Sequence, residues 1–355
     1  MCVSSFNYKE KLMGFDLRKL INQKVYHREY GMGAIVDVEE DEFIKAQFGE
    51  EIKTFTPYSI MYRHLILDND ELMDQFTVNY VIDEKKRVDA ALKPYLDELN
   101  HMIGLTRIKE QINDIVCEIN VNKLRKAFRL KAPASTRHMV FVGNPGTGKT
   151  TVARMVADIL HVLGVIPTNK LVEVDRSGLV AAYAGQTALK TKKVIESAIG
   201  GVLFIDEAYA ICRNDNDEYG YEALDTLTKC LEDHREDLVV IVAGYKEEMQ
   251  DFLNSNPGLS SRFKTIISFD DYSNEELLDI FLSLLKDNDY HLDKEAKKVV
   301  KEMFKNIDNL DGNGRSVRNL FEDIVRHQAR RVNSLENISV ECLSEIKACD
   351  LVLND

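Results

Sequence analysis

Apolar residues follow two alternating patterns between about residues 101 and 271. Short runs of consecutive apolar residues, typical of buried strands, alternate with longer stretches in which apolar residues recur at helical spacing. The five runs are His138–Val142, Leu171–Val174, Val202–Ile205, Leu238–Ala243 and Thr265–Phe269. Strands separated by helices predict a parallel sheet covered by helices, so we expect an α/β core domain over residues 99–271.

The N-terminal part has a different pattern, in which short strand-like runs are separated by glycine turns. We predict strands at Lys24–His27, Ala34–Val38, Phe43–Phe48 and Ile52–Phe55. Several strands in so few residues indicate a small β-barrel over residues 1–70, with a resemblance to SH3-like or Tudor-like modules. We expect its surface to be mostly acidic, which favours docking to a protein over binding to nucleic acid.

The remaining segments are predicted to be helical. From residue 71 to residue 98 the composition is helical and charged, and we interpret this stretch as a linker helix. From Tyr272 onward the pattern is helical throughout, and Ser273 with Glu276 is typical of a capping box that opens a helix. We therefore expect an all-helical lid over residues 272–355.

A glycine-rich loop follows the first apolar run. Residues 143–150 read GNPGTGKT and fit the phosphate-binding pattern G-x-x-x-x-G-K-[ST], between a strand and a helix. Glycines let backbone N–H groups approach phosphate oxygens, Lys149 adds a positive charge for the β- and γ-phosphates, and the Thr150 hydroxyl can ligate Mg²⁺. The predicted nucleotide-binding residues are Asn144, Pro145, Gly146, Thr147, Gly148, Lys149, Thr150 and Thr151.

Two adjacent carboxylates, Asp206 and Glu207, directly follow the apolar run Val202–Ile205. A carboxylate at the end of a buried strand can hold Mg²⁺ through its water shell, and we assign this role to Asp206. A second carboxylate beside it can polarise a water for attack on the γ-phosphate, so Glu207 indicates hydrolysis rather than binding alone. The alternative interpretation is a salt-bridged pair at a strand end.

Composition and charge narrow the classes of function. The chain has 355 residues, of which 45% are hydrophobic and 30% charged, as in soluble globular proteins of two or three domains. A net charge of −13 argues against general affinity for nucleic acid or anionic membranes. Without a membrane-length apolar run or a leader pattern, the sequence favours a cytoplasmic protein. The six cysteines form no C-x-x-C pair, so we expect reduced thiols.

Several blocks of the sequence resemble the AAA+ ATPases, and more narrowly the branch that contains red-type Rubisco activase and stage V sporulation protein K. The resemblance runs from about Leu99 to Gln328. Its blocks, in order, are Ile103–Leu105, His138–Thr151, Gly200–Tyr209, Leu238–Met249, Asn256–Phe263 and Gly312–Asn319. The resemblance implies a P-loop NTPase core with a helical lid, ATP and Mg²⁺ as cofactors, and assembly into a ring, which we expect to be a hexamer.

The resemblance also implies roles for residues outside the phosphate loop. Ile103, Gly104 and Leu105 match the segment that packs against adenine in this family, although on their own they would be interpreted as the core of a helix entry. Arg262 matches the catalytic arginine finger, which reaches the γ-phosphate bound by a neighbouring subunit and stabilises charge that develops in the transition state.

A lid arginine is implied as well. Arg315 lies in a Gly-Asn-x-Arg pattern that resembles sensor 2, which contacts the nucleotide of its own subunit. Arg318, one helical turn later, is the competing candidate. Either arginine could instead be only a surface ion-pair partner.

Two positions depart from the usual pattern of the family. Tyr183, Ala184 and Gly185 match a pore loop that grips an extended polypeptide, but Ala184 stands where a larger aliphatic residue is usual. The alternative for Tyr183 is an anchor in an ordinary loop. Sensor 1, usually Asn, Thr or Ser at the end of the fourth strand, is replaced by Ala243-Gly244-Tyr245, so no side-chain amide is available there to orient a water.

Three functions follow, in order of preference. The first is a chaperone-like ring ATPase that couples ATP hydrolysis to conformational work on a protein client. In this function Tyr183 pulls on the client, and residues 1–95 select it. The second is an ATP-controlled scaffold or switch that docks a partner through its N-terminal domain. The third, a small-molecule kinase, is disfavoured because the family blocks after Glu207 have no role in it.

Overall fold

The structure is a computed structural model that describes residues 15–39, 43–61, 64–128, 130–133, 136–183, 185–212, 216–306 and 312–351. The chain divides into two compact units. The first takes the described residues within Met1–Pro94 and Ile115–Ala134, and the second takes those within Tyr95–Asp114 and Ser135–Asp355. Two long helices, α2 (Asp70–His101) and α3 (Thr106–Ala127), contribute residues to both units.

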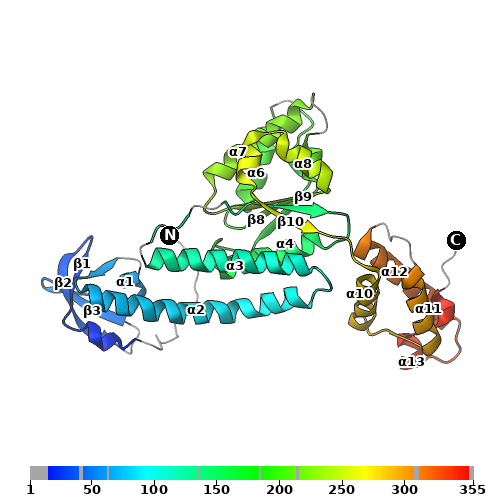
Figure 1. Ribbon diagram of the computed structural model, residues 1–355, viewed down its shortest axis with the longest axis horizontal. Helices are drawn as coiled ribbons and strands as arrows, with labels where there is room; N and C mark the ends of the chain where they lie inside the picture. The colour runs from blue at the N-terminus through cyan, green and yellow to red at the C-terminus, as the bar shows by residue number, and fades with distance from the viewer. Residues whose placement is uncertain are drawn as a thin grey trace. The chain divides into compact units, whose positions relative to one another are not determined.

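An antiparallel sheet forms the centre of the first unit, with five strands in the order β4-β3-β2-β1-β5 (Figure 1). Its elements are η1 (Leu17–Leu20), β1 (Lys24–His27), β2 (Gly31–Glu39), β3 (Phe43–Phe48), β4 (Glu51–Phe55), α1 (Tyr58–Met61) and β5 (Leu65–Leu67). Val25 pairs with Gly33 and Leu67, and this face is buried in the core with Ile35 and Ile44. The four predicted strands are confirmed and β5 adds a fifth. Closure into an SH3-like barrel stays a prediction, because β4 and β5 are the sheet's edges.

Helix α2 begins at Asp70 and contains the whole stretch that we interpreted as a linker helix. It continues through Pro94, where the missing N–H removes a helical hydrogen bond without ending the helix. The domain limits of 1–70, 71–98, 99–271 and 272–355 stay predictions.

The second unit contains a parallel sheet whose strand order is β10-β6-β9-β8-β7. The strands are β6 (Met139–Gly143), β7 (Leu171–Val174), β8 (Val202–Ile205), β9 (Val239–Gly244) and β10 (Thr265–Phe269). The helices around them are α4 (Lys149–Val162), α5 (Arg176–Leu179), α6 (Thr187–Ala198), η2 (Ala208–Ile211), α7 (Glu218–Asp233), α8 (Lys246–Asn254) and α9 (Pro257–Arg262).

Helices cover both faces of this sheet. Figure 1 shows α6, α7 and α8 on one face and α4 on the other. On the first face, Val140, Leu203 and Val240 from three neighbouring strands share one core with Leu224 and Leu227 of α7. The predicted parallel, helix-covered sheet is therefore confirmed.

The lid follows the last strand of the sheet. It consists of α10 (Asn274–Asp287), β11 (His291–Leu292), α11 (Lys294–Asn306), α12 (Asn313–Asn333), α13 (Val340–Ser344), β12 (Glu345–Ile346) and η3 (Ala348–Leu351). The predicted capping box of Ser273 and Glu276 is present at the start of α10. The expectation that the lid is all helical is wrong in one detail, since β11 and β12 pair in parallel and bring two segments far apart in sequence together.

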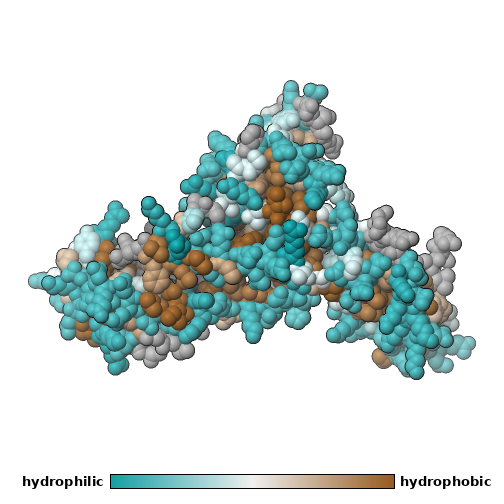
Figure 2. Space-filling model, viewed as in Figure 1, coloured by the Kyte–Doolittle hydropathy of each residue, from teal (hydrophilic) through white to brown (hydrophobic). Residues whose placement is uncertain are grey.

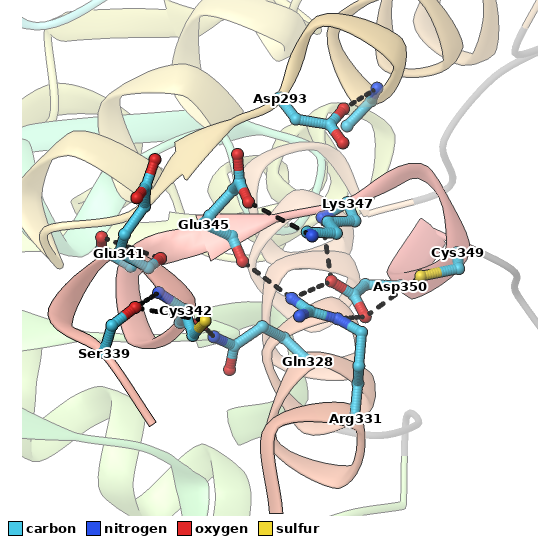
Figure 3. A network of polar contacts seen from close by, with 12 residues as sticks. Asp293, Gln328, Arg331, Ser339, Glu341, Cys342, Glu345, Lys347, Cys349 and Asp350 are labelled. Carbon is cyan, nitrogen blue, oxygen red and sulfur yellow. Dashed lines mark hydrogen bonds and ion pairs between the residues drawn. The ribbon is translucent and has the colours of Figure 1, made fainter. Parts of the chain in front are cut away.

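Arg331 of α12 fastens the C-terminal segment of the lid (Figure 3). Its guanidinium donates to both carboxylate oxygens of Asp350, at 2.8 and 2.9 Å, and to the carbonyl oxygen of Glu345 at 2.9 Å. The hydrogen bond with Asp350 raises the pKa of Arg331. Because the carboxylate is buried and paired in bidentate fashion, this contact fixes η3 and β12 on α12.

Hydrophilic residues cover most of the face of the molecule seen in Figure 2, as the 30% charged content leads one to expect. Among the exposed apolar side chains of the first unit, Tyr26 pairs with Met32 and Ile66 on the neighbouring strands. Within the described residues, no helix is both long and apolar enough to cross a membrane.

Candidate active site

A cavity of about 520 Å³ lies where the strands of the parallel sheet end. Residues that follow β6, β8 and β9 line it, together with residues from α10 and α12 of the lid. The space beyond the carboxyl ends of parallel strands is the usual ligand site of open α/β sheets. Of the residues predicted from the sequence, the wall contains Ile103, Pro145, Gly146, Gly148, Lys149, Thr150, Thr151, Asp206, Glu207 and Arg315.

The glycine-rich loop is held in one conformation by its own contacts. Gly146 has a φ of +74°, and a Cβ at this position would overlap the carbonyl oxygen of Gly312. Thr147 is buried, and its hydroxyl donates to the carbonyl oxygen of Asn144 at 2.8 Å. The glycine therefore serves two purposes, since it permits a left-handed backbone and lets the lid approach the loop.

Lys149 lies over the same loop. Its Nζ donates to the carbonyl oxygens of Gly143 and Asn144, each at 2.8 Å. Burial lowers the pKa of this amine, and the nearby Arg315 lowers it further, whereas the charge of Asp206 raises it. An additional negative charge at this position would stabilise the ammonium form, so the surroundings of Lys149 suit an anion such as a phosphate.

The segment Ile103–Leu105 lies between α2 and α3, and of its three residues Ile103 lines the wall, next to Met102. Gly104 and Leu105 both have positive φ, +64° and +57°. Leu105 is buried, and a Cβ on Gly104 would overlap the Glu276 carboxylate. Gly104 and Leu105 therefore shape the turn that presents Ile103.

Asp206 and Glu207 follow β8 on the wall of the cavity. Oδ1 of Asp206 accepts a hydrogen bond from the backbone N–H of Glu207 at 3.0 Å. Glu207 has a φ of +48°, a left-handed conformation that is uncommon for a residue with a side chain. Strain of this kind concentrates at functional sites, because it persists only where the surrounding structure enforces it.

Two tyrosines complete this side of the cavity. Tyr245 follows β9 and lines the wall with Gly244, while Ala243 is buried in the strand. Tyr209, which the sequence did not single out, also lines the wall, with its ring centroid 5.9 Å from that of Tyr245. Burial and the neighbouring Glu207 raise the pKa of Tyr209 to about 12, so its phenol is a neutral hydrogen-bonding group at physiological pH.

Both candidate lid arginines, Arg315 and Arg318, line the cavity from α12. The sequence missed the residues that hold this helix to the loop. Asn313 bonds to Asp271 at 2.8 Å, and the backbone N–H of Tyr272 donates to Asn313 at 3.0 Å. The sequence signal was that Asn313 lies inside the recognised block Gly312–Asn319. Its bond to Asp271 gave no signal, because hydrogen bonds between residues 42 apart leave no periodic pattern.

Arg262 lies outside the cavity of its own subunit. Its Nη2 pairs with a carboxylate oxygen of Glu232 on α7 at 3.2 Å, and its Nη1 donates to the carbonyl oxygen of Gly258 at 2.9 Å. Its Nε is buried without a hydrogen-bond partner. The structure thus does not bring Arg262 together with Lys149 in one chain.

The predicted pore loop also lies away from the cavity wall. Tyr183 is 71% exposed, and Gly185 has a φ of +74°. Ala184 lies outside the described residues. On the N-terminal side of the loop, Arg176 of α5 pairs with Asp217 at 2.6 Å in a largely buried contact. Tyr183 is therefore exposed on a loop whose N-terminal side is held by a largely buried ion pair.

Comparisons with known proteins agree with this geometry. A family model for the ATPase family associated with various cellular activities (AAA) matches residues 139–271, and one for the AAA lid domain matches residues 273–355. The solved FIGL-1 AAA domain in complex with ADP has a TM-score of 0.52 at 20% identity, covering 71% of this chain and 80% of its own. That similarity shows the fold alone.

Relatives cover most of the chain. A CfxQ homologue from Galdieria sulphuraria is 41% identical over 289 residues, which are 80% of this chain and 94% of the relative. Stage V sporulation protein K from Bacillus subtilis (strain 168) is 37% identical over 82% of this chain and 91% of its own. A chloroplastic ribulose bisphosphate carboxylase/oxygenase activase from Cyanidioschyzon merolae (strain NIES-3377 / 10D) is 43% identical over 73% and 88%. With its phosphate loop, paired carboxylates and lid around one cavity, the chain therefore belongs to the AAA+ family and is an ATPase.

Proposed function

We propose that this ATPase assembles into a ring and uses ATP hydrolysis to remodel a protein client. The observation that carries the proposal is that Tyr183 is 71% exposed. Its loop is held on the N-terminal side by the Arg176–Asp217 ion pair and does not line the nucleotide cavity. An exposed aromatic ring can hold a polypeptide by side-chain and backbone contact without requiring a particular sequence. Relatives that include a Rubisco activase support action on a protein.

The cavity suits ATP with Mg²⁺. Its volume of about 520 Å³ is in the range of small-molecule sites, and Lys149, Thr150 and Asp206 share its wall. In the described part of the chain, no group of three or more His, Cys, Asp or Glu side chains could hold a metal. One hydroxyl and one carboxylate suit Mg²⁺, which takes its other ligands from water and phosphate. When bound, the ion neutralises charge on the β- and γ-phosphates.

The residues on the wall divide the work of hydrolysis. Lys149 supplies positive charge to the phosphates, and Ile103 provides an apolar contact for the adenine ring of the nucleotide. Glu207, held in its strained conformation, acts as the base that polarises the attacking water. Arg315 contacts the nucleotide from the lid, with Arg318 beside it on the same wall.

Completion of this site requires a second subunit. Arg262 is turned toward Glu232 and lies outside the cavity of its own chain, as an arginine that serves a neighbouring site would. AAA+ proteins typically form rings, and a ring repeats one head-to-tail interface in which each subunit can complete the next. We propose a hexamer with Arg262 acting as the finger in trans.

Client selection is assigned to the first unit, within residues 1–95. Tyr26, Met32 and Ile66 are exposed neighbours across three strands, and an exposed apolar sheet face suits contact with protein. We propose that the sheet closes as an SH3-like barrel and docks a client or adaptor through this face.

The same face supports a second candidate function, an ATP-controlled scaffold. In that case hydrolysis resets the affinity of the first unit for a partner, and Tyr183 has no role in the cycle. The two functions make opposite statements about Tyr183.

The test therefore replaces Tyr183. A pull-down with Glu207→Gln in the presence of ATP first identifies the client, because the trapped ATP state should retain it. Remodelling of that client is then measured for Tyr183→Ala and Tyr183→Phe beside basal ATPase. The remodeller requires loss of remodelling in Tyr183→Ala, retention in Tyr183→Phe, and unchanged basal ATPase in both. Full remodelling by Tyr183→Ala would favour the scaffold.

A further inference from the structure

Asn313, the first residue of α12, joins the lid to two other parts of the second unit. The residue is 5% exposed, and its φ of +50° is a left-handed conformation that asparagine tolerates better than most residues. Its Oδ1 accepts a hydrogen bond from the backbone N–H of Tyr272 at 3.0 Å. Its Nδ2 donates to Oδ1 of Asp271 at 2.8 Å and to the carbonyl oxygen of Pro145 at 3.4 Å.

Asp271 receives the phosphate loop through the same carboxylate. Nδ2 of Asn144 lies 2.8 and 3.0 Å from its two oxygens. One carboxylate therefore accepts hydrogen bonds from the phosphate loop and from the lid, at the junction of β10 and α10. Charged acceptors strengthen such bonds relative to neutral ones.

Backbone contacts reinforce this junction. The N–H of Gly314 donates to the carbonyl oxygen of Gly146 at 3.1 Å, and the Tyr272 hydroxyl donates to the carbonyl oxygen of Thr147 at 3.4 Å. Gly146 leaves room for the Gly312 carbonyl, which a Cβ would displace. The first turn of α12 thus sits directly on the loop that binds phosphate.

We propose that Asn313 is a positioning residue for ATP hydrolysis, which couples the conformation of the phosphate loop to the orientation of the lid. Arg315 is two residues farther along the same helical turn and lines the cavity. Holding Asn313 against Pro145 and Asp271 therefore holds Arg315 at the nucleotide. The inference rests on the proposed nucleotide contact of Arg315.

Opposite the carboxylate of Asp271, an amide suits this position. Asn313 must accept from Tyr272 and donate to Asp271 at the same time, and a side-chain amide carries both an acceptor and donors. Asp at position 313 would place a second carboxylate against Asp271, and the like charges would repel. Replacing Asp271 by Asn in that variant restores a donor opposite an acceptor.

The test is a cycle of Asn313→Asp, Asp271→Asn and the double variant in the full chain. We expect Asn313→Asp to raise the KM for ATP about tenfold, the size of one lost charge-assisted hydrogen bond, and the double variant to return to within about threefold of wild type. Asp271→Asn alone should raise KM about threefold, because a neutral acceptor weakens both amide bonds. If Asn313→Asp does not fold, the KM of Asp271→Asn still tests the same hydrogen bonds.

A second readout separates positioning from mere stability. Hydrogen exchange of the α12 amides in a Glu207→Gln background should slow on addition of ATP, fail to slow with Asn313→Asp, and slow again in the double variant. An unchanged KM in Asn313→Asp, or no recovery in the double variant, would overturn the inference. Arg315→Ala tests the underlying site separately, since an unchanged KM there removes the sensor assignment and leaves the Asn313–Asp271 coupling measurable.

Discussion

The guanidinium of Arg262 lies 3.2 Å from the carboxylate of Glu232, and neither residue lines the nucleotide cavity that contains Lys149. The Arg262 side chain is 23% exposed and that of Glu232 is 53% exposed, so water competes for the pair. Exposed ion pairs contribute about 0.2–1 kcal/mol to stability. Such a weak contact costs little free energy to break, as the proposed role of Arg262 at a neighbouring subunit requires.

Arg262 and Glu232 are expected to respond differently to truncation. Arg262→Ala should lower kcat for ATP by about 10³-fold or more, because an arginine finger stabilises charge only in the transition state. Glu232→Ala should leave kcat within about threefold of wild type, since it removes only an exposed pair. Steady-state ATPase assays at saturating ATP compare the two. Equal losses would mean that Arg262 acts through its ion pair.

Glu207→Gln should keep ATP bound and stop its hydrolysis. The amide retains the size of the side chain but cannot accept a proton, so kcat should fall by about 10²- to 10⁴-fold while the Kd for ATP stays near wild type. Glu247→Gln, on the exposed first turn of α8, is the matched control and should change neither quantity. Turnover near wild type in Glu207→Gln would remove the assignment.

Tyr245 follows β9, where the resemblance places sensor 1, usually Asn, Thr or Ser. Because it lines the cavity and its ring lies 5.9 Å from that of Tyr209, we expect its hydroxyl to orient the attacking water. Tyr245→Phe should then lower kcat up to about tenfold without changing KM, the effect of one hydrogen bond lost in the transition state. Tyr209→Phe is the comparison. An unaltered kcat in Tyr245→Phe would mean that groups other than the Tyr245 hydroxyl orient the attacking water.

The free energy of unfolding should decrease as the pH is lowered, because of His138. Its Nδ1 accepts from the N–H of Val240 at 3.1 Å, and its Nε2 lies 3.4 Å from the Leu231 carbonyl, so the buried ring is neutral. Burial lowers its pKa below the ordinary 6.5. As pH falls below 6.5, the unfolded chain binds a proton that the folded chain does not, and unfolding becomes easier by about 1.4 kcal/mol per pH unit until the folded pKa is reached.

Urea unfolding at pH 7.5 and 5.5 measures this loss. His138→Gln should be less stable than wild type at the higher pH and should lose less stability on acidification. The same pH dependence in both proteins would assign the acid sensitivity to other groups.

Local patterns predicted the core of the fold well. The apolar runs over β6, β8 and β9 are buried on both faces, and the edge strands β7 and β10 are only partly buried but still apolar enough to be recognised. The loop at residues 143–150 carried its own chemistry. The short ladders were missed for a physical reason. β5 and β12 span only a few residues, and their pairing depends on partners far away in the chain.

The residues of the site that belong to sequence motifs could be predicted, whereas contacts that form only in the folded chain could not. Lys149, Asp206 and Glu207 belong to recognisable patterns and line one cavity. Asn313 belongs to the recognised Gly-Asn-x-Arg pattern, but its contact with Asp271 was not predictable, because only folding brings the two side chains within 2.8 Å of each other. Gly104 and Leu105 show the converse, since their pattern was recognised while their contribution is to shape a turn rather than to line the wall.

The most direct measurement mixes two inactive subunits. Arg262→Ala lacks the finger but keeps its own phosphate loop, whereas Lys149→Ala lacks nucleotide binding but keeps its finger. In randomly mixed rings, an Arg262→Ala site followed by a Lys149→Ala subunit is complete, so equal mixing should restore up to about one quarter of wild-type ATPase. ATPase that stays at the level of the separate variants, although the mixed rings form, would contradict a site completed by the neighbouring subunit.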